Sequence, residues 1–247
     1  SIFSSGVTQI NILVGTIIAS FEAGAVSYLY YADRIYQINL AIAGIAIGTV
    51  ALPELSKKLK IGNITEAMSI QNKSIELCLL LSVPACFGLI IASQQVVSAL
   101  FGYGSFLVKD VILTAQALKY FGFGVPAFAL IKILSNFFFA RDNTKTPFYI
   151  SVFSVFLNLV ISLVYFKEFG FIIIPIATSI ATWCAVIIYL ILLLKFKYLK
   201  INSIFFINFI KIVISVIIMC LFLYFSINYF EDKLIYTNYY KSFYLIM

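Results

Sequence analysis

Histidine is absent from the 247-residue sequence, and charged residues make up only 11% of it. Without histidine the chain cannot build a Ser-His-Asp triad, a histidine-ligated metal site or an imidazole proton relay. The charged fraction is far below the roughly 25% of ordinary soluble domains. Hydrophobic residues reach 63% and the mean hydropathy is +1.06. A soluble domain could not cover so much apolar surface, so the composition indicates an integral membrane protein.

Paired cysteines are missing as well. Cys78, Cys86, Cys184 and Cys220 lie singly in apolar stretches, and no CxxC pair occurs. Cysteine in such surroundings usually behaves as a small hydrophobic residue. We therefore expect no disulfide, no metal site and no cofactor.

The net charge of +7 would suggest nucleic-acid binding in a soluble protein. Here, however, lysine and arginine lie mainly between apolar runs and do not form one patch. That distribution is typical of loops that anchor membrane helices, so we expect no nucleic-acid partner.

Apolar runs close to the length of a membrane-spanning helix recur along the chain. A bilayer core of about 30 Å needs roughly 20 residues in a helix. The runs are continuously apolar and do not alternate, which favours helices over a β-barrel. We predict an all-α transmembrane bundle of about seven to eight spans. The expected spans cover residues 4–21, 25–52, 75–100, 111–140, 147–166, 170–194 and 204–229, with the start of another at 239–247.

The connections between these runs differ in charge. The second, fourth and sixth connections hold nine lysines and arginines, whereas the first, third, fifth and seventh hold only Lys109, Lys167 and Lys233. Cytoplasmic connections carry the excess of positive charge, so the first span should run outward from the cytoplasm. Within the connection 56–74, Asn63 and Glu66 have the spacing of a helix cap. We expect a short amphipathic helix on the cytoplasmic surface there.

Two charged residues, Asp33 and Arg34, lie one to two turns into the expected span 25–52. Insertion scales put each such charge at roughly 2.5–3.5 kcal/mol at a helix centre, so these residues usually face a wet cavity or a partner. Helical spacing places five polar residues on one side of this span, which predicts a water-filled or ligand-filled face. They are Ser27, Tyr30, Tyr31, Arg34 and Gln37.

Arginine suits phosphate binding, because its planar fork donates paired hydrogen bonds and its charge persists at biological pH. The alternative is that Asp33 and Arg34 lie near the outer interface and only anchor the helix. In the span before them, Gln9 and Asn11 belong to two polar faces that could line a cavity beside Arg34. Interhelical hydrogen bonding would explain Gln9 and Asn11 almost equally well.

Gly44 and Gly48 form a GxxxG spacing with alanines around them. Small residues at this spacing let another helix approach closely. We interpret the pair as a packing feature.

Three stretches resemble the MurJ/MviN family, the lipid II flippases of peptidoglycan synthesis: VTQINILVGTIIASF, YLYYADRIYQINLAIAGIAIGTVALPELS and FFFARDNTKTPFY. The resemblance runs in order over most of the chain and weakens after about residue 195. It implies an exporter fold of the multidrug/oligosaccharidyl-lipid/polysaccharide superfamily, with two helical lobes around a cationic cavity. Against the fourteen spans of that family, the chain resembles spans seven to thirteen and the start of fourteen. The partner it then needs is the N-terminal half of the same transporter.

The resemblance also implies roles for particular residues. Arg34 matches a cavity arginine of the family, which is expected to engage the pyrophosphate of the precursor, a lipid-linked disaccharide-pentapeptide. Asp33 and Gln37 would lie with it, and membrane lipids would surround the helices. Asn158 and Thr178 remain as possible oxygen ligands for a cation. Family members often carry acids where this chain has Gly15 and Ser162, so we do not expect sodium coupling.

These features predict a lipid II flippase in the bacterial cytoplasmic membrane that works by alternating access and is not an enzyme. One alternative is a drug or polysaccharide-lipid exporter of the same superfamily. Another is a membrane enzyme acting on polyprenyl phosphates, but the loop acids form no DxD pattern that would hold its metal.

Overall fold

The computed structural model describes residues 12–200, 202–230, 234 and 245. Every regular element among these residues is a helix, which confirms the all-α prediction. Residues 12–19 are helical and precede the labelled elements. Those elements are α2 (Ala25–Leu40), the π-helix η1 (Ala41–Ala46), α3 (Ile47–Lys60), α4 (Ile64–Phe101), α5 (Val108–Phe139), α6 (Lys145–Phe169), the 3-10 turn η2 (Gly170–Ile172), α7 (Ile173–Lys195) and α8 (Ser203–Tyr229).

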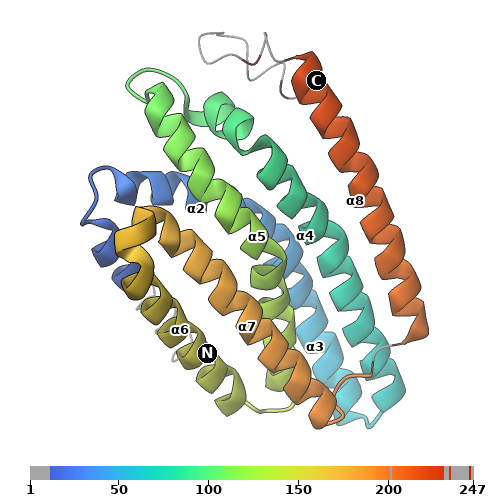
Figure 1. The fold of residues 1–247 in the computed structure, drawn as a ribbon. Helices are drawn as coiled ribbons and strands as arrows, with labels where there is room; N and C mark the ends of the chain where they lie inside the picture. Colours follow the sequence, from blue (N-terminus) through green and yellow to red (C-terminus); the bar gives the residue numbers. More distant parts are fainter. Residues whose placement is uncertain (1–11, 201, 231–233, 235–244, 246–247) are drawn as a thin grey trace.

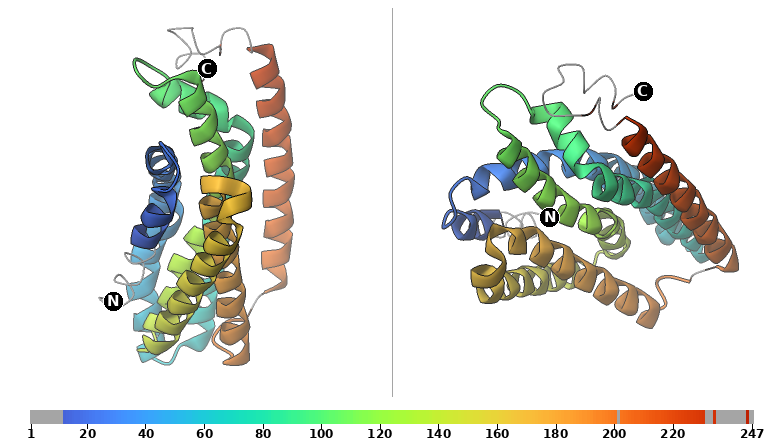
Figure 2. Two further views of the ribbon diagram at one scale, coloured as in Figure 1. Left: turned by 60° about the vertical axis from the view of Figure 1, so that its left-hand side comes forward. Right: turned by 45° about the horizontal axis from the view of Figure 1, so that its top comes forward.

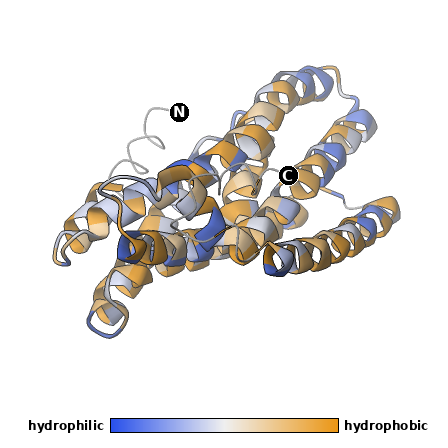
Figure 3. Cartoon of the chain, turned by 90° about the horizontal axis from the view of Figure 1, so that it is seen from above, coloured by the Kyte–Doolittle hydropathy of each residue, from blue (hydrophilic) through white to orange (hydrophobic). Residues whose placement is uncertain are grey.

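Five continuous helical stretches of the described chain are long and apolar enough to cross a membrane. One of them, Lys145–Lys195, contains both α6 and α7, which reverse direction at η2 and lie side by side (Figure 1). Gly170 makes this reversal with a φ of 59°, a backbone conformation that glycine adopts without steric cost. Hydrophobic residues run along all of these helices (Figure 3).

The first labelled helix is longer than the expected span 25–52. It continues from α2 through η1 into α3 and passes Pro53 without ending. Residues 56–60 complete α3, and α4 begins at Ile64, so the expected surface helix at 56–74 does not exist as a separate element. Asn63 does cap α4, because its side-chain oxygen accepts the Glu66 backbone N–H at 3.1 Å. Lys58 adds an ion pair to Glu66 at 2.8 Å.

Helix α5 occupies the middle of the bundle and contacts α2, α3, α4 and α7 (Figures 1 and 2). Long apolar side chains such as Phe121, Leu134 and Phe138 are buried along it. Helix α8 lies at the edge, where it packs mainly on α4 and leaves most of its apolar surface exposed (Figure 2). Lipid would cover that surface in a membrane.

The lysine- and arginine-rich connections α3–α4, α5–α6 and α7–α8 all lie at one end of the bundle, the lower end in Figure 1. Arg141 joins the α5–α6 connection to the α7–α8 connection there. Its guanidinium donates to the carbonyl oxygens of Phe137 at 2.7 Å and Tyr198 at 3.0 Å, and it lies 4.4 Å from the centre of the Tyr198 ring. Asn72 on α4 donates to the Lys200 carbonyl at 2.8 Å. The α7–α8 connection is therefore tied to both α4 and α5.

Candidate functional site

Three adjoining hollows lie between α2–η1–α3 on one side and α6–α7 on the other, with α5 between them. We call them the upper, middle and lower hollows, following Figure 1, and together the groove. Their volumes are 190, 440 and 430 Å³. Asp33 and Tyr36 line both the upper and the middle hollow, and Lys132 and Tyr189 line both the middle and the lower one. The groove is therefore continuous along the bundle.

Asp33 and Gln37 lie together in this groove. The Gln37 amide donates a hydrogen bond to the Asp33 carboxylate, one helical turn away. Both side chains are partly buried and both line the middle hollow. A carboxylate and an amide so placed can bind hydroxyl and amide groups of a polar ligand.

Arg34 lies at the rim of the groove. Its guanidinium donates to the Tyr30 hydroxyl at 2.9 Å and lies 4.7 Å from the centre of that ring. Tyr30 lines the upper hollow, whereas Arg34 is exposed and is not among the described residues that line any of the three hollows. Tyr31 turns away from the groove and packs against Phe101, with ring centres 4.8 Å apart and the rings tilted by 48°. The polar face expected on this helix is thus split between the groove and the neighbouring helix α4.

Gln9 and Asn11, the other residues expected at the site, lie outside the described residues. The residues that follow them do reach the groove. Ile12, Gly15 and Thr16 all line the upper hollow. The end of the first helix therefore forms part of its wall.

Asn158 and Thr178, the expected cation ligands, also line the upper hollow. Ser162 donates to the Asn158 side-chain oxygen at 3.1 Å, and the Asn158 amide donates to the Thr178 hydroxyl at 2.9 Å. Thr178 in turn donates to the Ile174 carbonyl at 2.7 Å. This chain of neutral groups joins α6 to α7. Asp33 is the carboxylate that lines the upper hollow with them. In the described part of the chain, no cluster of three or more acidic or cysteine side chains could hold a metal ion.

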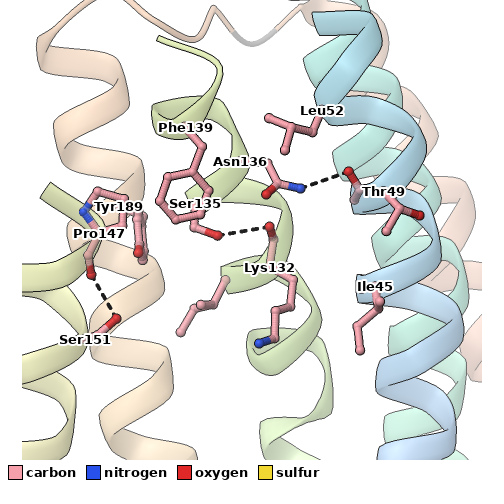
Figure 4. A pocket seen from close by; sticks show the side chains of 13 residues that line it. Ile45, Thr49, Leu52, Lys132, Ser135, Asn136, Phe139, Pro147, Ser151 and Tyr189 are labelled. Atoms are coloured by element: carbon pink, nitrogen blue, oxygen red, sulfur yellow. Dashed lines mark hydrogen bonds between the residues drawn. The ribbon is translucent and has the colours of Figure 1, made fainter. Parts of the chain in front are cut away.

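Lys132 is a groove residue that the sequence analysis missed. It lies inside the expected span 111–140, whereas positive charge was counted only in the connections. The structure places it on α5 between Ile45 on one side and Ser151 and Tyr189 on the other (Figure 4). A lysine surrounded by apolar residues in a span is the same signal that drew attention to Arg34.

Gly44 of η1 and Gly48 of α3 lie in the contact with α5. A Cβ added at Gly44 would lie 3.1 Å from the Ala129 Cα, and one added at Gly48 would lie 2.8 Å from the Asn136 amide nitrogen. That amide donates to the Gly48 carbonyl at 3.0 Å (Figure 4). The GxxxG pair thus serves packing, as interpreted from the sequence, and it also lines the lower hollow.

Comparison with protein families identifies the chain. The family model described as lipid II flippase MurJ matches residues 1–245. The chain belongs to the MurJ family. Family membership and the apolar helices place it in the bacterial inner membrane.

Curated relatives agree with this assignment. The chain is 44% identical over 180 residues to a probable lipid II flippase MurJ of Rickettsia prowazekii, covering 73% of this chain and 36% of that protein. It is 43% identical over 180 residues to a protein of the same name from Rhizobium meliloti, covering 73% and 34%. The chain thus spans about a third of the length of these relatives.

Solved structures show the same fold. A lipid II flippase MurJ in an inward closed conformation superposes with a TM-score of 0.74 at 26% identity, covering 93% of this chain and 52% of that one. A multidrug transporter of the MATE family, in an outward-facing conformation, superposes with a TM-score of 0.68 at 15% identity, covering 92% and 51%. The second likeness concerns the fold alone. In both cases this chain corresponds to about half of the solved transporter.

Proposed function

We propose that this chain forms one lobe of a lipid II flippase and supplies one wall of its substrate cavity. The main support is the groove: a continuous hollow in membrane-spanning helices that carries charged and amide side chains, in a chain of the MurJ family. Hydrocarbon would not tolerate such a surface, whereas a polar headgroup or water would fill it. The other wall would come from the N-terminal portion that the longer relatives possess.

Arg34 would contact the pyrophosphate of the lipid-linked precursor. Its fork is held at the rim of the groove by Tyr30, and its exposed face leaves further donors free for an anion. Asp33 and Gln37, deeper in the groove, would bind sugar or peptide groups by hydrogen bonds. Binding at the rim leaves the lipid tail in the bilayer while the headgroup enters the cavity.

Transport would follow from alternating access. Rocking of the two lobes would expose the headgroup to one side of the membrane and then to the other, and no covalent bond would be broken. The membrane potential or an ion gradient would supply the driving force.

The test is lipid II translocation by the complete transporter in proteoliposomes, with Arg34→Ala compared to the unmodified protein. We expect at least a tenfold loss of rate, because an arginine–phosphate contact contributes on the order of 1.5–3 kcal/mol. Arg34→Lys keeps the charge without the fork and should retain part of the rate. Unchanged translocation by Arg34→Ala would remove this residue from the mechanism. Competition binding of lipid II against cationic drugs distinguishes a drug exporter, since a drug exporter would bind the drugs and a lipid II flippase would bind the lipid.

A further inference from the structure

Lys132 places a positive charge on the exposed wall of the groove, inside a membrane-spanning helix. It lies seven residues before the end of α5, or about 10 Å along the helix axis. Among the described residues, its ammonium has no hydrogen-bond or ion-pair partner. The ion pair found among these residues joins Lys58 to Glu66. An uncompensated charge at such a position needs water or an anionic ligand.

The direction of the side chain argues against simple anchoring at the near membrane surface. Side chains of a helix tilt toward its N-terminus, which for α5 is the upper end in Figure 1. Figure 4 shows the Lys132 side chain extending away from the Phe139 end of α5. Lys132 therefore reaches toward the middle hollow and away from the C-terminal end of α5. A lysine that served only as an anchor would extend toward that nearer end of the helix.

In the lower hollow the polar neighbours of Lys132 are neutral, whereas in the middle hollow it shares the lining with Asp33. Ser135 donates to the Lys132 carbonyl at 3.1 Å, Ser151 donates to the Pro147 carbonyl at 2.8 Å, and Asn136 donates to Gly48. The hydroxyl protons of both serines are thus already bonded to the backbone of their own helices. The ammonium is the cationic group in this part of the groove, so it is the strongest donor there for an anion.

The separation of Lys132 from Arg34 sets the length of a ligand that could reach both. The Gly48 contacts with Asn136 and with the Lys132 carbonyl put Lys132 level with about residue 46 of the neighbouring helix. Arg34 lies about twelve residues earlier in that helix, which corresponds to about 18 Å. A fully extended peptide of five residues spans about 17 Å, so a pentapeptide can cover this distance.

We infer that Lys132 forms a second anion-binding subsite, which takes a carboxylate of the precursor's peptide while the pyrophosphate lies at Arg34. This inference rests on the proposed function and specifies it further. The groove would then recognise both ends of the headgroup. A lipid that carries pyrophosphate and sugars without the peptide would engage only the upper end.

The experiment compares two ligands on the complete transporter in lipid nanodiscs: the undecaprenyl-pyrophosphate disaccharide with its pentapeptide and the same lipid without peptide. Lys132→Gln should weaken binding of the peptide-bearing lipid about tenfold, as expected for loss of one charge-assisted hydrogen bond, and leave the peptide-free lipid unchanged. Lys132→Arg keeps the charge and should bind both lipids within a few-fold of the unmodified protein. Retained binding of the peptide-free lipid also shows that Lys132→Gln is folded.

Lys119→Gln is the matched control. Lys119 is exposed on the same helix, about 140° around its axis from Lys132, and does not line the described groove. It should change neither affinity. Equal weakening of both lipids by Lys132→Gln, or weakening of neither, would overturn the inference. So would recovery of binding on adding Asp33→Asn, because that result would mean that Lys132 only balances the Asp33 charge across the groove.

Failure of the proposed function gives a different pattern. Arg34→Ala should weaken both lipids to the same extent, since both carry pyrophosphate. If neither lipid binds the unmodified transporter, the flippase assignment fails and the Lys132 subsite fails with it. If both bind and depend on Arg34 but not on Lys132, only the second subsite is wrong.

Discussion

Gly48 lies at a close contact between α3 and α5, and its missing side chain permits this contact. A Cβ there would come within 2.8 Å of the Asn136 amide nitrogen, which donates to the Gly48 carbonyl. Helix packing in membranes depends on such close contacts, because lipid supplies no hydrophobic force to drive helices together. The lower hollow takes its shape from the same contact.

Gly48→Ala should therefore destabilise the bundle. We expect a loss of about 1–3 kcal/mol, from strain at the contact and a weakened hydrogen bond to Asn136. The measurement is the thermal unfolding midpoint in detergent. Gly88→Ala is the control, because a Cβ at Gly88 meets nothing within 4 Å. Equal midpoints for the two variants would show that the α3–α5 contact tolerates an added methyl group.

At the scale of the elements, the α7–α8 connection is held by side chains that come from other helices. Arg141, after α5, donates to the Tyr198 carbonyl, and Asn72 of α4 donates to the Lys200 carbonyl. Burial lowers the pKa of the Arg141 guanidinium, but the ordinary pKa of arginine is so high that the charge persists at neutral pH. Helix α8 packs along α4, and this anchor fixes the connection that leads into it.

Arg141→Gln should loosen that anchor. Two hydrogen bonds from a charged donor and the stacking on Tyr198 would be lost, for which we expect about 2–4 kcal/mol. Hydrogen exchange should rise in residues 196–200 and remain unchanged in α5. Lys145→Gln, which removes an exposed charge from the same end, should leave exchange as it was. If residues 196–200 stay protected from hydrogen exchange in Arg141→Gln, the bond from Asn72 to the Lys200 carbonyl is what holds this connection.

At the scale of the whole molecule, the groove divides the described helices into two walls with α5 between them. The upper hollow contains Asn158 and Thr178, whose polar groups are hydrogen-bonded to each other and to Ser162 and Ile174. A hard cation such as sodium prefers oxygen ligands that include carboxylates. The neutral chain therefore supports a role in joining α6 to α7 better than a role in sodium coupling.

Translocation by the complete transporter should consequently be the same in sodium and in potassium buffers of equal ionic strength. The measurement is the initial rate of lipid II translocation at a fixed membrane potential. Asn158→Ala should lower stability through the lost bond to Thr178, without creating a difference between the two ions. A rate several-fold higher in sodium would show that these oxygens bind the cation after all.

Much of the architecture could be predicted from the sequence, because transfer of a residue into lipid depends mainly on its own side chain. The apolar runs predicted a helical membrane bundle, and the spacing of Asn63 and Glu66 predicted a cap that the structure contains. The limits of the helices were harder to predict. The expected span ends at residue 52, but α3 passes Pro53 and continues to Lys60.

The composition of the groove was decided only by tertiary structure, because residues far apart in the chain form it. Asp33 of α2, Lys132 of α5 and Thr178 of α7 share the middle hollow, although about a hundred residues separate the first two. Helical periodicity within one segment placed Arg34 on a polar face, yet it could not place that side chain at the rim and Asp33 inside. A pattern along one helix fixes which residues share a side, whereas the packing of neighbouring helices fixes which side encloses a cavity.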